Sequence, residues 1–540
     1  MPSHPTSMWK RSPNKLRQNE IWLECFYFTS LFVAALVLFL VNLGNLPLLD
    51  LNEGTVAQIA KEISQNFQTP QSWIFPTLWG EPYLDRPPLV HGLIAIAYKV
   101  FGVSEFTTRF PGALLGAVSV ILLYNIGREI FVARFPALFS ALVYLTCLPV
   151  VRYSRLAMLD GPLLCFELLT IWAIVRSRRD LRWSLLAGMG LGLMALTKGV
   201  ISLQILIVVG VFLLWDTPRL LTSPYFLGGI VIGVIPGLGW YAAQWFHYHE
   251  FKTAGDFVDL FLGGVATVKS SSQLSVEHYL LRGIQYFLPW LIMMWGGLRL
   301  AAHHLHWGWG KLIFTWVIIY IPLVCLVVNR EYWSILPLYP GLALAAGKQL
   351  DLIRNLPSYI KYPQAWIYGC VLMAAMATFA GLHWGVRNYV DFYLPFICGS
   401  LAITFAATAI IIAQREREFI PLLFWGLFVS IFLLVISPHW IWELNAIEPV
   451  KPIAELIQQY TSKEQVIYTS MAQKRNSLGF YSDRQIVNQK FTDLKQHWQD
   501  DANVCLLIDS QVVEKLNIPR EMIVKDPQKS LNWMLAIKKS

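Results

Sequence analysis

The sequence predicts an all-α polytopic membrane protein of about 13 transmembrane helices, with amphipathic helices in its first outer loop and a small α/β domain after the last span. Three observations predict this fold class. Only 14% of the 540 residues are charged, against about 25% in soluble domains. Apolar runs of roughly 17–25 residues, the length that crosses a bilayer, recur along the chain. After about residue 440 these runs stop, and short polar and apolar segments alternate.

The predicted spans divide the chain into a transmembrane domain, residues 1–438, and a C-terminal domain, residues 439–540. The first span follows a basic segment and has no clear small-x-small cleavage site, so we expect a start-transfer helix and not a removed signal peptide. The spans are expected at 21–43, 109–127, 133–151, 161–177, 184–198, 200–215, 225–246, 284–301, 311–328, 334–350, 365–382, 394–413 and 418–437.

Lysine and arginine in the short loops predict the orientation of the spans. Basic residues before the first span place the N-terminus in the cytoplasm, and the basic loops 177–183, 351–361 and 414–418 fall on the same side. The loops 44–108 and 152–160, and the C-terminal domain, then lie outside. We expect a multi-pass monomer in a bacterial cytoplasmic membrane, with its active site facing the periplasm. The net charge of +9 is therefore a topology and lipid signal, and no nucleic-acid partner is expected.

The C-terminal domain is expected to contain both strands and helices. PVKPIAELIQQY reads as an amphipathic helix begun by a proline, with Ile453, Leu456 and Ile457 on one stripe. QVIYTS, QIVNQ, NVCLLIDS and EMIVKD read as short strands between polar turns. These elements predict a small external α/β domain.

The first outer loop, residues 44–108, carries the first candidate catalytic acids. Asp50, Asn52 and Glu53 precede VAQIAKEI, an amphipathic helix expected to lie in the interface. Acids at this position could meet an acceptor at the membrane surface. They could equally cap the helix, because carboxylates are favoured at a helix N-terminus.

Asp160 and Arg86 are the other candidates on the outer side. Asp160 precedes a span and could act with Glu53 as a general base for an acceptor, although an acid before Gly-Pro is also an ordinary helix cap. Arg86, in GEPYLDRPPL, is held between an acid and two prolines and suits a phosphate; pairing with Asp85 or lipid snorkelling is the alternative. Lys198 and Arg330, at outer span ends, could bind the same anion or anchor the helices.

Two further candidates are aromatic and metal-binding residues. Tyr332 and its neighbours in NREYWSILPLYPGLAL could contact a donor or form an interfacial aromatic belt. Asp85 and His278 could supply two ligands to a divalent metal, whereas a structural histidine is the simpler reading. The sequence has no P-loop, GxGxxG, HExxH or GxSxG motif, so a nucleotide donor in a Rossmann fold is not expected.

Taken in order, these motifs resemble a family of membrane enzymes. AQIAKE, PYLDRPPL, FGVSEFTTRFPGAL, MLDGPL, LTKG and YWSILPLYPGLALAAG are similar to motifs of integral-membrane glycosyltransferases of the GT-C fold. The resemblance is to the aminoarabinose transferase and protein O-mannosyltransferase group, of the glycosyltransferase family 39 and 83 type, over about residues 20–350. It implies transfer of a sugar from a polyprenyl-phosphate donor to a lipid or protein acceptor, with inversion.

Carried over by motif, the resemblance assigns roles to single residues. The family's acid pair falls on Asn52 and Glu53 and its second acid on Asp160, while Tyr83, Asp85 and Arg86 match the motif that holds the lipid phosphate and, in one branch, a metal. No cofactor other than such a divalent ion is implied. Asn52 departs from the family, since an amide cannot accept a proton, so Asp50 or Glu53 would serve instead.

Two alternatives remain open at the level of sequence. A flippase or transporter for lipid-linked sugars would place charges inside its spans, and Glu167 is one of the few acids there. A catalytically impaired homologue that binds lipid-linked sugar would be consistent with Asn52. The acids on the outer side favour the enzyme.

Overall fold

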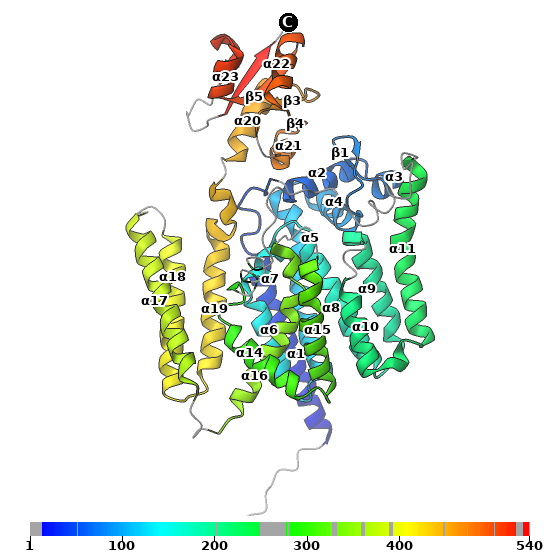
Figure 1. The fold of residues 1–540 in the computed structure, drawn as a ribbon, viewed down its shortest axis with the longest axis vertical. Coiled ribbons are helices and arrows are strands. Elements are labelled where there is room, and N and C mark those ends of the chain that lie inside the picture. Colours follow the sequence, from blue (N-terminus) through cyan, green and yellow to red (C-terminus); the bar gives the residue numbers. More distant parts are fainter. Residues whose placement is uncertain are drawn as a thin grey trace, which may run out of the picture.

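The computed structural model describes residues 13–50, 52–199, 204–248, 285–326, 332–357, 362–387, 392–446, 449–471, 474–501, 503–524 and 533–538, together with 277, 281 and 283. Most of these residues form helices, which stand roughly parallel in a bundle (Figure 1). The bundle helices are α1 (Pro13–Leu40), α5 (Glu105–Ile130), α6 (Arg134–Leu145), α7 (Leu148–Arg155), α8 (Asp160–Ser177), α9 (Trp183–Lys198), α10 (Gln204–Asp216), α11 (Pro224–Tyr248), α14 (Leu291–His303), α15 (Gly308–Leu326), α16 (Leu338–Arg354), α17 (Gln364–Arg387), α18 (Tyr393–Ala413) and α19 (Phe419–Ile436).

Seven of the described helices are long and apolar enough to cross a membrane: α1, α5, α11, α15, α17, α18 and α19. The pair α6 and α7 could form an eighth span, bent by 59° at its break. The other predicted segments, 161–177, 184–198, 200–215, 284–301 and 334–350, overlap α8, α9, α10, α14 and α16, which are shorter or more charged. A polytopic helical membrane protein is therefore supported, and the number of 13 spans stays a prediction.

Small residues bring α9 and α11 into backbone contact. A Cβ atom added to Gly188 would lie 1.7 Å from the carbonyl oxygen of Gly229, and one added to Gly233 would lie 1.8 Å from that of Gly188. Close approach at small residues is how helices associate where lipid tails provide no hydrophobic driving force. A Cβ atom added to Gly237 would lie 3.0 Å from the Ala195 side chain, so the close contact extends to the last turn of α9, which carries Lys198.

The first outer loop folds over one end of the bundle (Figure 1). It contains α2 (Asn52–Gln65), α3 (Pro70–Ile74), the two-residue strands β1 (Thr77–Leu78) and β2 (Glu81–Pro82), and α4 (Leu89–Phe101). The apolar stripe predicted for 56–63 is buried against α4: Val56 and Ala60 share a cluster with Ile94 and Tyr98. The amphipathic helix expected here is therefore confirmed, with its apolar face packed against α4, and its place in the membrane interface stays a prediction.

The C-terminal region forms a five-stranded sheet with helices on both faces. The strands are β3 (Ile467–Thr469), β4 (Ile486–Asn488), β5 (Val504–Asp509), β6 (Ile523–Val524) and β7 (Trp533–Lys538), in the order β4-β3-β5-β7-β6. β3 pairs in parallel with β4 and β5, whereas β7 is antiparallel to β5 and β6. The helices are α20 (Val450–Tyr460), α21 (Asn476–Ser482), α22 (Phe491–Asp500) and α23 (Ser510–Leu516).

The central strand β5 explains why this sheet is covered on both faces. Cys505 and Leu507 belong to the cluster that contains α20, and Leu506 and Ile508 belong to the cluster that contains α22 and α23. A strand buried on both faces reads as a continuous apolar run, as NVCLLIDS does. Four of the five strands coincide with the segments predicted from the sequence, and β7 does not.

Helix α21 joins this region to the first outer loop. The Arg475 Nε atom and the Ser477 hydroxyl both donate to the Asp50 carboxylate, the former over 3.0 Å. Lys61 pairs with Asp483 at 2.9 Å, and Phe480 packs into the cluster shared by α2 and α4. The C-terminal region is thus anchored on α2, directly over the bundle (Figure 1).

Candidate functional site

Glu53, the candidate acid of the first loop, is completely buried in an ion pair. Its Oε1 and Oε2 atoms accept from Nε and Nη2 of Arg109 at 2.8 and 2.7 Å, and both side chains have 0% exposure. The backbone N–H groups of Leu49 and Ala157 donate to the same oxygens at 2.9 and 2.7 Å. Four donors occupy the approximately four lone-pair sites of a carboxylate. This environment favours a structural role for Glu53 over the catalytic role expected from the sequence.

Arg109 ties the first loop to the bundle through its remaining N–H groups. These donate to the carbonyl oxygens of Leu43, Leu46 and Pro47 at 2.8–3.0 Å. Sequence reasoning placed Arg109 only inside a family motif and gave it no role. Its position in the sequence does indicate a buried ion pair, because an arginine near the start of an apolar span needs a partner inside the protein.

Asp50 is also engaged, but with the C-terminal region. Its carboxylate accepts from Arg475 and Ser477, and 14% of the side chain is exposed. Asp50 therefore lies at the junction between the loop and α21, and the structure does not bring it together with Asp160.

The residues that do come together are Asp160, Lys198 and Arg86. Asp160 begins α8, Lys198 ends α9, and their charged groups are 2.6 Å apart. Arg86 Nη1 donates to the carbonyl oxygen of Lys198 at 3.4 Å. The Asp160 side chain is 5% exposed and that of Lys198 16%. The sequence singles out all three residues but does not predict that the acid and the lysine form an ion pair.

A small cavity opens beside this ion pair. It has a volume of about 50 Å³ and is lined by Asp160, Lys198 and Glu167, with Gln204, Tyr320 and Trp333 among the other lining residues. Glu167 is buried, and its Oε2 atom has no hydrogen-bond partner. Ligand pockets usually hold about 300–1,000 Å³, so a sugar can enter only after the surrounding elements move apart.

Tyr83 and Asp85 lie in the loop between β2 and α4. Tyr83 packs edge-on against the buried His91, with ring centroids 5.7 Å apart. Burial and, next, the charge of Asp85 raise the pKa of Tyr83, so its hydroxyl stays protonated and can donate to a phosphate. Asp85 itself is exposed.

The remaining candidates are only partly described. Arg330 and His278 lie outside the described residues, and so does the side chain of Tyr332, which begins a short 3₁₀ turn. No group of three His, Cys, Asp or Glu side chains comes together within the described part of the chain. Among the described residues there is therefore no set of three side-chain ligands for a metal, and the contact predicted between Asp85 and His278 stays a prediction.

Comparison with known proteins agrees with the resemblance seen in the motifs. The family model described as dolichyl-phosphate-mannose-protein mannosyltransferase matches residues 85–240. An uncharacterized protein of Aquifex aeolicus is 24% identical over 86% of this chain and 88% of its own length. An undecaprenyl phosphate-alpha-4-amino-4-deoxy-L-arabinose arabinosyl transferase of Aeromonas hydrophila is 24% identical over 64% of this chain and 65% of its own. The chain thus spans less than two thirds of that transferase.

Solved structures extend the likeness to the whole fold. ArnT from Cupriavidus metallidurans superimposes with a TM-score of 0.76 in its apo state, covering 95% of this chain and 98% of its own at 17% identity. In its complex with undecaprenyl phosphate the TM-score is 0.74 at 18% identity, covering 94% and 97% of the two chains. The archaeal oligosaccharyltransferase AglB from Archaeoglobus fulgidus matches with a TM-score of 0.52 at 11% identity, over 90% of this chain and 70% of its own. The predicted resemblance to GT-C-fold membrane glycosyltransferases of the aminoarabinose-transferase and mannosyltransferase type is therefore confirmed.

Proposed function

We propose that the protein is a membrane glycosyltransferase that moves a sugar from a polyprenyl-phosphate donor to a lipid or protein acceptor, with inversion at the sugar carbon. The observation that carries this proposal is the ion pair of the buried Asp160 with Lys198 beside the cavity, with Arg86 hydrogen-bonded to the same lysine. The two cations can bind a phosphate, and the acid beside them can activate an acceptor hydroxyl.

The two cations would act on the donor phosphate. Arg86 and Lys198 bind its oxygens, and Lys198 leaves Asp160 as it does so. As the bond between the sugar carbon and the phosphate oxygen breaks, both cations neutralise the charge that develops on the leaving lipid phosphate. Arg330, Tyr332 and Tyr83 are further candidates for contacts with this phosphate.

Release from Lys198 would free Asp160 to act as the base. The acceptor hydroxyl oxygen attacks the sugar carbon from the face opposite the phosphate, and its proton passes to the Asp160 carboxylate. Asp50 and Glu53, the other acids expected to be catalytic, act in this proposal by holding α2 over the cavity. An Asp85–His278 metal contact is not needed for any step.

The finer architecture is part of the same proposal. We place 13 spans in residues 1–438 and an external α/β domain in residues 439–540, in a bacterial cytoplasmic membrane with the site on the periplasmic side, and we expect a monomer. The first-loop helices and α21 would move together to admit the donor. Glu167, a buried acid inside α8, is the observation that suits the alternative, a transporter or an inactive protein that binds lipid-linked sugar.

The test is sugar transfer by purified protein from a radiolabelled polyprenyl-phosphate sugar. Asp160→Asn is expected to lower the rate by about 10²–10⁴-fold, the usual contribution of a positioned base, while donor binding persists. Arg86→Ala is expected to weaken donor binding. Asp216→Asn is the matched control, because Asp216 is a buried acid paired with Lys311 at 3.3 Å at the far end of α10.

Two outcomes would contradict the proposal. Transfer that is unchanged in folded Asp160→Asn would remove Asp160 from the chemistry. Donor binding without transfer by the wild type, for every donor tested, would leave a binding protein or a transporter.

A further inference from the structure

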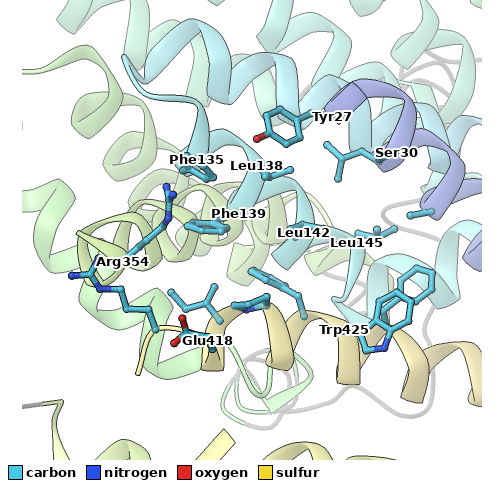
Figure 2. Close-up of a pocket in the computed structure, with 17 residues that line it drawn as sticks. Tyr27, Ser30, Phe135, Leu138, Phe139, Leu142, Leu145, Arg354, Glu418 and Trp425 are labelled. Atoms are coloured by element: carbon cyan, nitrogen blue, oxygen red, sulfur yellow. The ribbon is translucent and has the colours of Figure 1, made fainter. Parts of the chain in front are cut away.

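A second and larger cavity lies between α1, α6 and α19, away from the proposed site. It has a volume of about 730 Å³. Leu138, Phe139, Leu142 and Leu145 line it along α6, and Trp425 lines it from α19 (Figure 2). Its wall is therefore almost entirely apolar, as expected for a groove that takes a hydrocarbon chain.

The cavity has charged side chains at one end only. Figure 2 shows Arg354 and Glu418 together at that end, whereas Trp425 lies at the other. Arg417, which precedes Glu418 in the chain, also lines it. Arg354 lies in the last turn of α16, and Arg417 and Glu418 lie in the turn before α19. This is the end of the bundle opposite α2 (Figure 1), the one that the basic loops predict to be cytoplasmic.

The two arginines are held in place but keep free donors. The Arg354 guanidinium stacks on Phe135, 3.3 Å from the ring centroid, and Arg417 Nη2 donates to the carbonyl oxygen of Leu356 at 2.7 Å. Neither is ion-paired within the described part of the chain, and the same holds for Glu418. Each guanidinium carries five N–H donors, so most of them remain for an anion.

The depth of the groove matches one leaflet. The lining residues of α6 run from Phe135 to Leu145, which at about 1.5 Å per residue is about 15 Å. The hydrocarbon core of a bilayer is about 30 Å thick. A chain that starts at the arginines and follows α6 would therefore end near the middle of the membrane, as an acyl chain does.

We propose that this groove binds one phosphatidylethanolamine molecule of the leaflet on that side. Its phosphate lies between Arg354 and Arg417, its ammonium group donates to Glu418, and one acyl chain lies along α6. The carboxylate selects this head group, because an ammonium N–H gives a stronger, charge-assisted hydrogen bond than a glycerol hydroxyl. The site is separate from the sugar-transfer site and does not depend on the proposed function.

The experiment is native mass spectrometry of the full-length protein in detergent, titrated with phosphatidylethanolamine, phosphatidylglycerol or phosphatidylcholine of identical acyl chains. Phosphatidylethanolamine is expected to bind most tightly. Arg354→Ala and Arg417→Ala should each weaken it by about fivefold, the value of one interfacial cation. Glu418→Gln should abolish the preference for phosphatidylethanolamine but keep phosphate-dependent binding. Ala34→Phe should block the groove, and Arg182→Ala, an exposed arginine in the 177–183 loop, is the matched control.

Several results would overturn the proposal. One is equal binding of the three lipids by the wild type, which would remove the role of Glu418. Another is an unchanged affinity in Ala34→Phe, which would place the lipid elsewhere. A third is a polyprenyl phosphate that co-purifies with the wild type and is lost in the arginine variants, which would show that this lipid, and not phosphatidylethanolamine, occupies the groove. Size-exclusion profiles show whether each variant is folded.

Discussion

Replacing Glu53 by Gln removes the charge that balances Arg109 but keeps the size of the side chain. In the wild type four donors converge on this carboxylate, two from Arg109 and one each from the backbone of Leu49 and Ala157. A glutamine has one acceptor oxygen and presents N–H groups where two of these donors point. Breaking a buried ion pair on one side costs about 3–5 kcal/mol. We therefore expect Glu53→Gln to lower the free energy of unfolding by about that amount.

The assay combines unfolding with activity. Reversible denaturation of the detergent-solubilised protein gives the loss of stability, and transfer is measured per folded molecule. The double variant Glu53→Met/Arg109→Met is expected to recover much of the loss, because it leaves no unpaired buried charge. If Glu53→Gln is as stable as the wild type but transfers sugar at least about 100-fold more slowly, the structural assignment is refuted and Glu53 is a catalytic residue.

Two further predictions concern contacts between elements. Burial raises the pKa of Asp483, but the hydrogen bond and charge of Lys61, together with the charges of Lys463 and Arg484, outweigh this effect, so the pKa lies below its ordinary value of 3.8. Because the pKa of Asp483 is lowered by folding, its contact with Lys61 stabilises the docking of α21 on α2 at pH values above 3.8 and is lost as the pH falls through the lowered pKa. Hydrogen exchange of α2 and α21 should therefore rise at that low pH in the wild type and not in Asp483→Asn. Gly188→Ala should destabilise the bundle by at least about 1–3 kcal/mol, because its Cβ would meet Gly229. Gly239→Ala is the control: its Cβ would have nothing within 4 Å, so it should cost less than half as much. Equal decreases of the melting temperature in the two variants would argue against the backbone contact of α9 with α11.

The helical segments were predictable because long apolar runs have few alternatives in a membrane. A break inside one of them was not: the sequence predicts a single span at 133–151, whereas a 59° bend separates α6 from α7. Such breaks depend on packing against neighbours. Strand β7 was missed because residues 533–538 carry no alternating pattern, and their pairing with β5 is a contact that local sequence cannot encode.

At the site, residue types were easier to predict than partners. Asp160, Lys198 and Arg86 were singled out because charges at span ends are few. The pairing of Glu53 with Arg109, and of Asp50 with Arg475, joins segments far apart in the chain. A helix cap, a catalytic acid and a buried ion pair all begin with the same carboxylate in the sequence, so only the three-dimensional structure separates these roles.

The contact between α2 and α21 also bears on how this protein could be recombined with its relatives. A Cβ atom on Gly54 would lie 2.3 Å from the backbone nitrogen of Ser477, so any larger residue at one position demands a shift at the other. Together with the bonds of Asp50 to Arg475 and Ser477, this makes the two segments a matched pair. A chimera that receives a foreign C-terminal region should keep its fold only if residues 50–61 are exchanged along with it.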